Sequence, residues 1–367
     1  MARQDRSAWP AVTIGIEPGF PAAIDAVAER AGDARSFLRA AWYAGTAGGT
    51  AGAATLVARR ADGAPFAAIP TLPAGPRLLG ARSVPGSYWP FRSFPVAADA
   101  CEEEMAALIA HPEARRLMAP FLRIGPVYAD DPAAGALLRA AERAGWTVLR
   151  RNLGTAFRID IAERQAAGPW PSKSSQRRLR TYEKQLSALG PVRVRQVAGD
   201  GWTPDVLDDL ATIEAQSWVG QDSDRSGAKF LTDEKRAGWL RAAADPLLAD
   251  MLTATILHVG DRPAAFTFDM LCGRVQYGIA GSYDKDYAAH SPGKFIAYRQ
   301  YDVALERGVT LVDLGAGDSG YKRAQGAEPG PAILDCLIVR NRALAALLRR
   351  KWKKDTDGGT GAKTVPA

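Results

Sequence analysis

The chain has 367 residues, of which 47% are hydrophobic and 24% charged, and its 47 basic and 40 acidic side chains give a net charge of +7. Such a chain can bury a sizeable core, and its composition excludes collagen-like, coiled-coil and wholly disordered proteins. No apolar run approaches the roughly 18 residues that suggest a membrane span, and the charged N-terminus is not followed by the apolar stretch of a secretory leader.

Cysteines and histidines are few and scattered. Cys101, Cys272 and Cys336 lie far apart, which is neither a disulfide framework nor a CxxC site, and the three histidines lack HExxH spacing. We therefore expect a cytoplasmic protein without a metal site. The moderate basic excess is compatible with a phosphate-bearing ligand: a nucleotide, coenzyme A or RNA.

The first half of the chain mixes helices with strand pairs. A Gly/Ala/Thr stretch at 44–54 fits neither glycine-rich phosphate motif and is expected to be a flexible connection. The proline- and aromatic-rich stretch 82–95 either lines a cleft or is a loop anchored by aromatic packing. The regular elements expected here are helices near 22–31, 34–43 and 132–144, and strands at 55–60, 65–71, 122–127, 147–152 and 155–161.

The pattern lapses around 162–170, which predicts a domain boundary there. We expect an N-terminal domain over 1–165, a C-terminal domain over 166–354 and a disordered, Gly-rich tail over 355–367. The second domain opens with a basic amphipathic helix at 172–189, whose five cations either contact phosphates or form a solvated face. The elements expected after it are strands at 192–197, 251–259, 264–271, 275–283, 310–314 and 332–339, and helices at 204–218, 292–307 and 341–353.

Two hairpin turns in the two halves are alike. Asp62-Gly63-Ala64-Pro65 and Gly260-Asp261-Arg262-Pro263 each lie between apolar strands. This similarity indicates an internal duplication.

The second half resembles a known family. Tyr283, then Ser291-Pro292-Gly293-Lys294-Phe295, then Gly308, Asp313, Gly317 and Tyr321-Lys322 are similar in type and spacing to the "BioF2-like" acetyltransferase domain. That domain is a branch of the GNAT acyltransferases and is related to the Fem-type aminoacyl transferases, which pair two GNAT folds. The usual GNAT pyrophosphate signature is absent; His290-Ser291-Pro292-Gly293-Lys294 stands in its place.

The resemblance implies an α/β (α+β) fold of two tandem GNAT-like domains, each a mixed, mainly antiparallel sheet flanked by helices. It implies an N-acyltransferase that moves an acyl group, acetyl for preference, from acyl-CoA to an amine of a small molecule or sugar. The alternatives are a Fem-like transferase that uses aminoacyl-tRNA and a non-catalytic accessory of polysaccharide synthesis.

The start of the predicted helix at 292 suits a phosphate. Its first N–H groups are unpaired and its dipole favours an anion. Gly293 permits close approach of the ligand, Lys294 adds a charge, and Ser291 and Pro292 complete the loop after Tyr283. The other interpretation is a well-capped helix start without a ligand.

Further candidates follow the predicted strand at 310–314. Asp313 and Asp318 are candidates for orienting or deprotonating the amine, or for capping a turn. By the resemblance, Tyr321 would protonate the leaving thiolate, and Lys322 would bind phosphate or the acceptor. Two aromatic residues are candidates for the substrate pocket. They are Tyr277, on one wall, and Trp218, which otherwise packs in the core.

Overall fold

The computed structural model describes residues 10–46, 49–75, 80–86, 91–221, 227–317 and 320–357. It divides into two compact units. Unit 1 comprises Met1–Ala156, Ala316–Ser319 and Gly330–Ala367, and unit 2 comprises Phe157–Gly315 and Gly320–Pro329.

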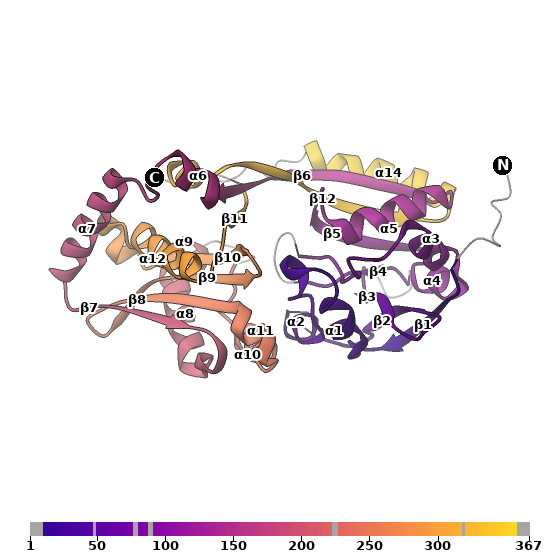
Figure 1. Ribbon diagram of the computed structural model, residues 1–367, viewed down its shortest axis with the longest axis horizontal. Coiled ribbons are helices and arrows are strands. Elements are labelled where there is room, and N and C mark those ends of the chain that lie inside the picture. The colour runs from indigo at the N-terminus through magenta and orange to yellow at the C-terminus, as the bar shows by residue number, and fades with distance from the viewer. Residues whose placement is uncertain are drawn as a thin grey trace. The chain divides into compact units, whose positions relative to one another are not determined.

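Unit 1 holds a sheet with helices packed against it (Figure 1). Its own strands are β1 (Val12–Pro18), β2 (Ala54–Arg60), β3 (Pro65–Pro73), β4 (Arg82–Ser83) and β5 (Phe121–Tyr128). Its helices are α1 (Ala23–Ala28), α2 (Ala40–Thr46), α3 (Glu102–Ala110), α4 (Pro112–Leu117), α5 (Pro132–Arg143) and α14 (Arg342–Asp357).

Unit 2 also combines strands and helices. Its own strands are β7 (Val192–Val197), β8 (Leu252–Val259), β9 (Arg262–Cys272), β10 (Val275–Tyr283) and β11 (Leu311–Ala316). Its helices are α6 (Ile161–Ala167), α7 (Lys173–Ser187), α8 (Pro204–Gln216), α9 (Trp218–Gln221), α10 (Asp233–Ala242), α11 (Pro246–Met251), α12 (Pro292–Glu306) and α13 (Tyr321–Ala324).

Two long strands contribute residues to both units. They are β6 (Thr147–Asp160) and β12 (Glu328–Val339). In unit 1 the strand order is β1-β2-β3-β4-β5-β12-β6, and in unit 2 it is β6-β11-β10-β9-β8-β7. The β4–β5 and β10–β11 pairs are parallel, while the pairs along β1 to β4 and along β7 to β10 are antiparallel.

The same order of strand pairings therefore occurs in each unit. The two similar turns lie at equivalent places, between β2 and β3 and between β8 and β9. Gly63 and Gly260 have φ values of +86° and +61° there, a left-handed conformation that glycine adopts at little cost. A mixed, mainly antiparallel sheet flanked by helices is confirmed.

Local sequence explains where the helices begin. Asp131 caps α5, because its side chain accepts a hydrogen bond from the Ala134 N–H at 2.9 Å. Ser172 caps α7 in the same way, through the Ser175 N–H at 3.2 Å. Pro132 and Pro292 occupy the first turns of their helices, where a missing N–H costs nothing.

The structure differs from the sequence-based expectation in several places: β1, α3, α4, α6, α10 and α11 were not predicted, and the helix expected near 34–43 is α2 at Ala40–Thr46. Three further differences concern β6, the division into units and the last helix. The strands predicted at 147–152 and 155–161 are one strand, β6, which continues through Gly154 at φ +133°. The two units do not divide at 165/166, since Phe157 begins unit 2 and Gly330–Ala367 belongs to unit 1. The last helix extends to Asp357, and the rest of the predicted tail lies outside the described residues.

Candidate active site in unit 2

The pairing of β10 with β11 stops early. The two strands pair in parallel at three positions only, and the last pair joins Tyr277 to Asp313. A register shift between Gly278 and Ala280 marks a bulge in β10 just beyond that pair. Because a bulge bends its strand, β10 leads away from β11 over its remaining residues. This agrees with the separation of central strands that the family resemblance implies.

The start of α12 is strained. Ser291 has φ +51° and ψ +47°, and no other non-glycine residue in the described ranges has a positive φ. This conformation costs on the order of 1–3 kcal/mol and is concentrated at functional sites. The Ser291 side chain makes no capping hydrogen bond, and Pro292 is buried. The first turn of α12 is therefore not capped in the way that an ordinary serine start would be.

Tyr283 lies directly against this helix start. A Cβ atom on Gly293 would lie 3.0 Å from Cδ1 of Tyr283, so the tyrosine ring packs against the glycine backbone. Lys294, next along the helix, is exposed. The structure thus brings together Tyr283 and the segment from Ser291 to Lys294, as the sequence predicted.

Asp313 is a buried, paired carboxylate. Its Oδ2 accepts a hydrogen bond from Nε of Arg158 at 2.8 Å, and its Oδ1 accepts one from the Gly315 N–H at 2.9 Å. The first bond ties β11 to β6, and the second shapes the end of β11. Asp313 therefore joins three segments: β6 through Arg158, β11 itself, and the turn at Gly315.

The two candidates on α13 differ in exposure. The Tyr321 side chain is 48% exposed, whereas Lys322 is only 4% exposed. The Lys322 ammonium donates a hydrogen bond to the Gly315 carbonyl at 3.1 Å and lies 5.9 Å from the Phe157 ring centroid. Lys322 is therefore not a solvated lysine, since it binds α13 to the end of β11. Asp318 lies outside the described residues.

Asp269, on β9, is a residue that sequence reasoning missed. It is buried, and its Oδ1 accepts a hydrogen bond from the Gln276 amide at 2.9 Å. The same Oδ1 lies 3.6 Å from where a Cβ on Gly278 would be, and the Asp313 carbonyl lies 3.4 Å from that point. The carboxyl group therefore lies beside Gly278, where the pairing of β10 with β11 has just ended.

Three buried polar atoms near this point lack hydrogen-bond partners among the described residues. They are Oδ2 of Asp269, Oε1 of Gln276 and Oγ1 of Thr267. Burial raises the pKa of Asp269 to about 7, against the opposing effects of the neighbouring Gln276 and Thr267 side chains. A buried carboxyl group that titrates near neutrality is suited to proton transfer.

Tyr301, on α12, is close enough to Asp269 for the charge of that carboxyl group to act on it. Its hydroxyl donates a hydrogen bond to Oε1 of Gln325 at 2.5 Å. Burial, and next the charge of Asp269, raise its pKa well above the usual value for tyrosine. Tyr301 is therefore a neutral hydrogen-bond donor at physiological pH.

Comparison with known proteins agrees with this geometry. Residues 173–323 match the family model for the acetyltransferase (GNAT) domain. This match covers α7 to α13 of unit 2 and supports a transferase.

Solved structures show the same fold over most of the chain. FemX is 12% identical, with a TM-score of 0.60 over 89% of this chain and 97% of that one. The L-PGS structure from Bacillus licheniformis is 13% identical, with a TM-score of 0.53 over 92% of this chain and 98% of that one. No curated protein sequence matches the chain significantly. The expected GNAT-type fold is confirmed, and FemX shares this fold.

The two aromatic candidates differ in their surroundings. Tyr277 is buried in β10 at the last pair with β11, so it borders the point where the strands part. Trp218 begins α9 and is 51% exposed, which excludes the core position that was its alternative.

The basic helix α7 opens the GNAT domain. Lys173, Arg177, Arg178, Arg180 and Lys184 are all exposed. No carboxylate in the described parts of the chain forms an ion pair with any of these five residues. The apolar face of α7 packs through Leu186, which is fully buried.

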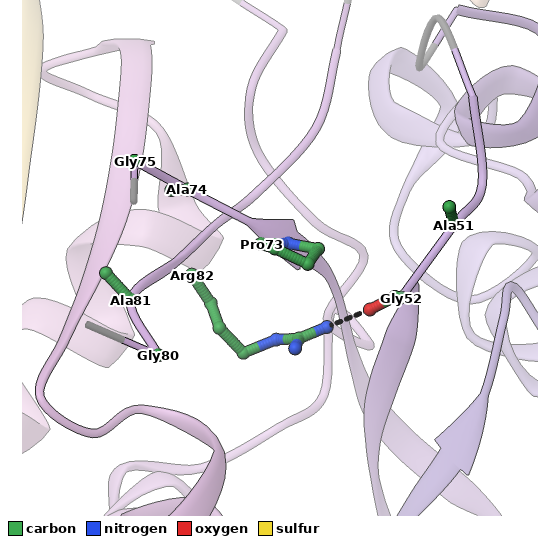
Figure 2. Close-up of a pocket in the computed structure, with 8 residues that line it drawn as sticks. All are labelled: Ala51, Gly52, Pro73, Ala74, Gly75, Gly80, Ala81 and Arg82. Carbon is green, nitrogen blue, oxygen red and sulfur yellow. Dashed lines mark hydrogen bonds between the residues drawn. The ribbon is translucent and has the colours of Figure 1, made fainter. Parts of the chain in front are cut away.

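Two cavities lie elsewhere. One of about 150 Å³ in unit 2 is lined in part by Thr253, Thr255 and Gln300. The other, of about 330 Å³, lies in unit 1 outside the GNAT match and is lined by small residues and Arg82. Figure 2 shows the Arg82 guanidinium directed at the Gly52 carbonyl, to which it donates at 2.7 Å. The predicted Gly/Ala connection thus contributes Ala51 and Gly52 to a cavity wall.

Within the described ranges, no helix is long and apolar enough to cross a membrane. No group of three or more His, Cys, Asp or Glu side chains there is arranged to hold a metal ion.

Proposed function

We propose that the GNAT domain of unit 2 is an N-acyltransferase that moves an acyl group, acetyl for preference, from acyl-CoA to an amine of a small molecule or sugar. The observation that carries this proposal is the early end of the β10–β11 pairing at Tyr277 and Asp313. Beside that point lie a buried carboxyl group with an unpartnered oxygen, Asp269, and the polar side chains around it.

The donor would be held at the start of α12. Backbone N–H groups of its first turn and the Lys294 ammonium would bind the diphosphate of coenzyme A. Gly293 leaves room for the Tyr283 ring, which packs against the glycine backbone and would hold this turn in place for the donor. The acyl arm would enter between β10 and β11, where backbone N–H groups near the bulge would polarise the carbonyl.

Proton transfer would use Asp269 and Tyr321. As the amine nitrogen forms a bond to the acyl carbon, it loses a proton to the Asp269 carboxylate. As the C–S bond breaks, the thiolate of coenzyme A takes a proton from the Tyr321 hydroxyl. The proton held by Asp269 then passes to the tyrosinate, so the net transfer is from nitrogen to sulfur and both side chains are regenerated.

The remaining candidates would position the site. Asp313, paired with Arg158, would fix the end of β11 against β6, and Lys322 would fix α13 against β11. Tyr277 would line the acyl slot, and Trp218 would contribute an exposed ring to acceptor binding. Asp318 would lie in the segment between β11 and α13.

Donor binding tests the proposal directly. Acetyl-CoA at 100 times its Kd should stabilise the chain by about 2.7 kcal/mol in thermal unfolding. Lys294→Ala should weaken binding roughly ten- to hundredfold, because one charge-assisted contact is worth about 1.5–3 kcal/mol. Lys285→Ala removes an exposed charge near the same loop and should change nothing. Absence of any shift with acetyl-CoA or longer acyl-CoAs would refute the proposed donor.

The exposed, unpaired cations of α7 favour a second candidate, a transferase that takes an aminoacyl group from tRNA. A basic helix that binds an RNA backbone loses affinity steeply with salt, by a slope of about 0.7–0.9 per phosphate contact. Charged tRNA should then bind in filter assays, and Arg177→Gln/Arg178→Gln should reduce that slope by about 2. Acetyl-CoA turnover without tRNA binding would exclude this candidate.

A further inference from the structure

We infer that the open edge of β7 in unit 2 binds an acidic segment of a partner polypeptide, which adds to the sheet as a further strand. Two strands, β8 and β9, separate this edge from β10. The inference therefore does not depend on the proposed function.

The outer edge of β7 presents unpaired backbone groups. β7 is the last strand in the order of unit 2, and among the described strands it pairs with β8 alone (Figure 1). Beside the first residue pair, the Gly260 N–H donates to the Pro191 carbonyl at 2.9 Å. Inward and outward backbone groups alternate in an antiparallel pair, so the N–H and C=O groups of Val192, Val194 and Gln196 point away from β8.

Nothing in the described parts of the chain covers this edge. The outward N–H and C=O groups have no hydrogen-bond partner there, and the side chains from Arg193 to Gln196 are exposed. Soluble proteins commonly close such an edge with a proline or a bulge. β7 contains no proline, and its register with β8 is continuous over Val192–Val197. The edge is therefore able to accept another strand.

The charge of β7 selects the kind of strand. Arg193 and Arg195 lie on one face, two residues apart, and neither forms an ion pair within the described ranges. Antiparallel pairing of two copies of this edge about Val194 would place Arg193 opposite Arg195, and like charges directly opposite are destabilising. A strand that carries carboxylates opposite the two arginines is instead attracted. The edge thus suits an acidic partner and disfavours a second copy of this chain.

A cavity adjoins the same edge on its other face. It measures about 150 Å³ and is lined in part by Gln196, Thr253, Thr255, Gln300 and Arg307. The exposed Arg307 donates to the Asp250 carbonyl at 3.1 Å and forms no ion pair among the described residues. A partner residue opposite Gln196 shares its face of the sheet. An acidic side chain at that place would enter a polar cavity that has its own cation.

A synthetic peptide tests the inference on the full, unchanged chain. Ac-Val-Glu-Glu-Val-Glu-Val-NH2, antiparallel to β7, places glutamates opposite Gln196, Arg195 and Arg193. It should bind in fluorescence anisotropy. Methylation of its backbone nitrogens opposite Val192, Val194 and Gln196 should abolish binding, because those N–H groups face β7. Methylation opposite the two arginines should leave binding unchanged, because those N–H groups face away.

Variants of β7 test the same contact from the protein side. Val194→Pro removes an outward N–H but no bond to β8, and it should weaken peptide binding about tenfold. Val194→Ala is the matched control, because it keeps the N–H and should bind like the wild type. Arg193→Gln/Arg195→Gln should also weaken binding, without lowering the unfolding temperature.

The two methylated peptides decide the outcome even if Val194→Pro folds poorly. If both bind equally well, or if Val194→Pro binds like Val194→Ala, β7 does not accept a strand and the inference fails. If only Arg193→Gln/Arg195→Gln weakens binding, the surface attracts polyanions in general, RNA included, and the inference fails as well. Loss of binding with one methylated peptide alone supports strand addition, since charge does not distinguish the two.

Discussion

The two units share an order of strand pairings but differ at the fourth strand. In unit 2 that strand is β10, with nine residues, a bulge and a helix start against its last tyrosine. In unit 1 it is β4, with two residues, followed by a proline- and aromatic-rich stretch whose described residues, 84–86 and 91–95, contain no helix. Both units nevertheless keep the parallel step to the next strand.

This difference shows that a shared topology does not preserve a shared site. A donor slot needs two strands long enough to pair and then separate, and β4 is too short to form one. Unit 1 instead holds the buried carboxylate Asp335 at a bulge between β5 and β12, ion-paired with Arg123 and Arg151. We therefore expect one acyl-CoA per chain, bound in unit 2, and the following variants test this division of roles.

The largest effect on stability is expected in unit 1. Asp335→Ala should lower the free energy of unfolding by about 3–5 kcal/mol, because it leaves two arginines without their buried partner. The measurement is urea denaturation. Asp313→Ala removes the corresponding partner of a single arginine in unit 2 and should cost less stability but more turnover. Equal losses of turnover in both variants would contradict the assignment of catalysis to unit 2.

The pKa of Asp269 makes stability depend on pH. The folded-state pKa of about 7 is raised above the value near 3.9 that aspartate has in an unfolded chain. The folded state therefore favours the protonated form, and the cost of ionisation grows from pH 4 to pH 7. Relative to Asp269→Asn, the wild type should lose about 4 kcal/mol of unfolding free energy across that window. A constant difference between pH 4 and 8 would show that Asp269 titrates normally.

Catalysis should depend on the same side chain. Asp269→Asn should lower kcat/KM about a hundredfold at pH 8, because the amide cannot accept the proton from the amine. The acidic limb of the pH profile near pH 7 should disappear, while the affinity for acetyl-CoA stays unchanged. If the limb persists in the variant, another group accepts the proton.

A smaller effect is expected at Gly278. A side chain there would point toward the Asp313 carbonyl and Oδ1 of Asp269, at 3.4 and 3.6 Å from its Cβ. Gly278→Val should lower the free energy of unfolding by about 1–3 kcal/mol through overpacking. It should also weaken acyl-CoA binding, by a larger fold-change than the decrease in the folding rate. Gly281→Val is the control, because that position is exposed and its Cβ would approach only the Phe266 carbonyl, at 3.6 Å.

Much of the fold was predictable because strong local signals mark its boundaries. Ser-Pro at 291–292 and Gly308 mark the two ends of α12, and β10 begins and ends at the predicted residues. The long strand β6 was not predictable as one strand. A glycine such as Gly154 usually indicates a break between two strands, whereas here it lies within a continuous strand. The sequence also did not show that β6 and β12 contribute residues to both units, since no local pattern specifies a distant strand partner.

The site was predictable in part for the same reason. The loop from Tyr283 to Lys294 is contiguous and carries its own turn chemistry. Asp269 is a single carboxylate in the apolar stretch FTFDML, and only the three-dimensional packing shows that it is buried beside Gly278. A lone acid at an inward position of a buried strand was the available signal. No sequence signal indicated that Lys322 is buried, because α13 has only four residues and is too short to show a periodic apolar pattern.

Because β6 and β12 contribute residues to both units, the polypeptide cannot be divided at a single point between two self-contained domains. A fragment ending at residue 165 would lack β12, leaving β5 with an open edge and Arg123 and Arg151 without Asp335. An open edge of this kind invites intermolecular strand pairing, so such a fragment should aggregate. Adding Gly330–Val339 as a separate peptide should restore the missing strand of the fragment, since an extended peptide can pair with an exposed sheet edge.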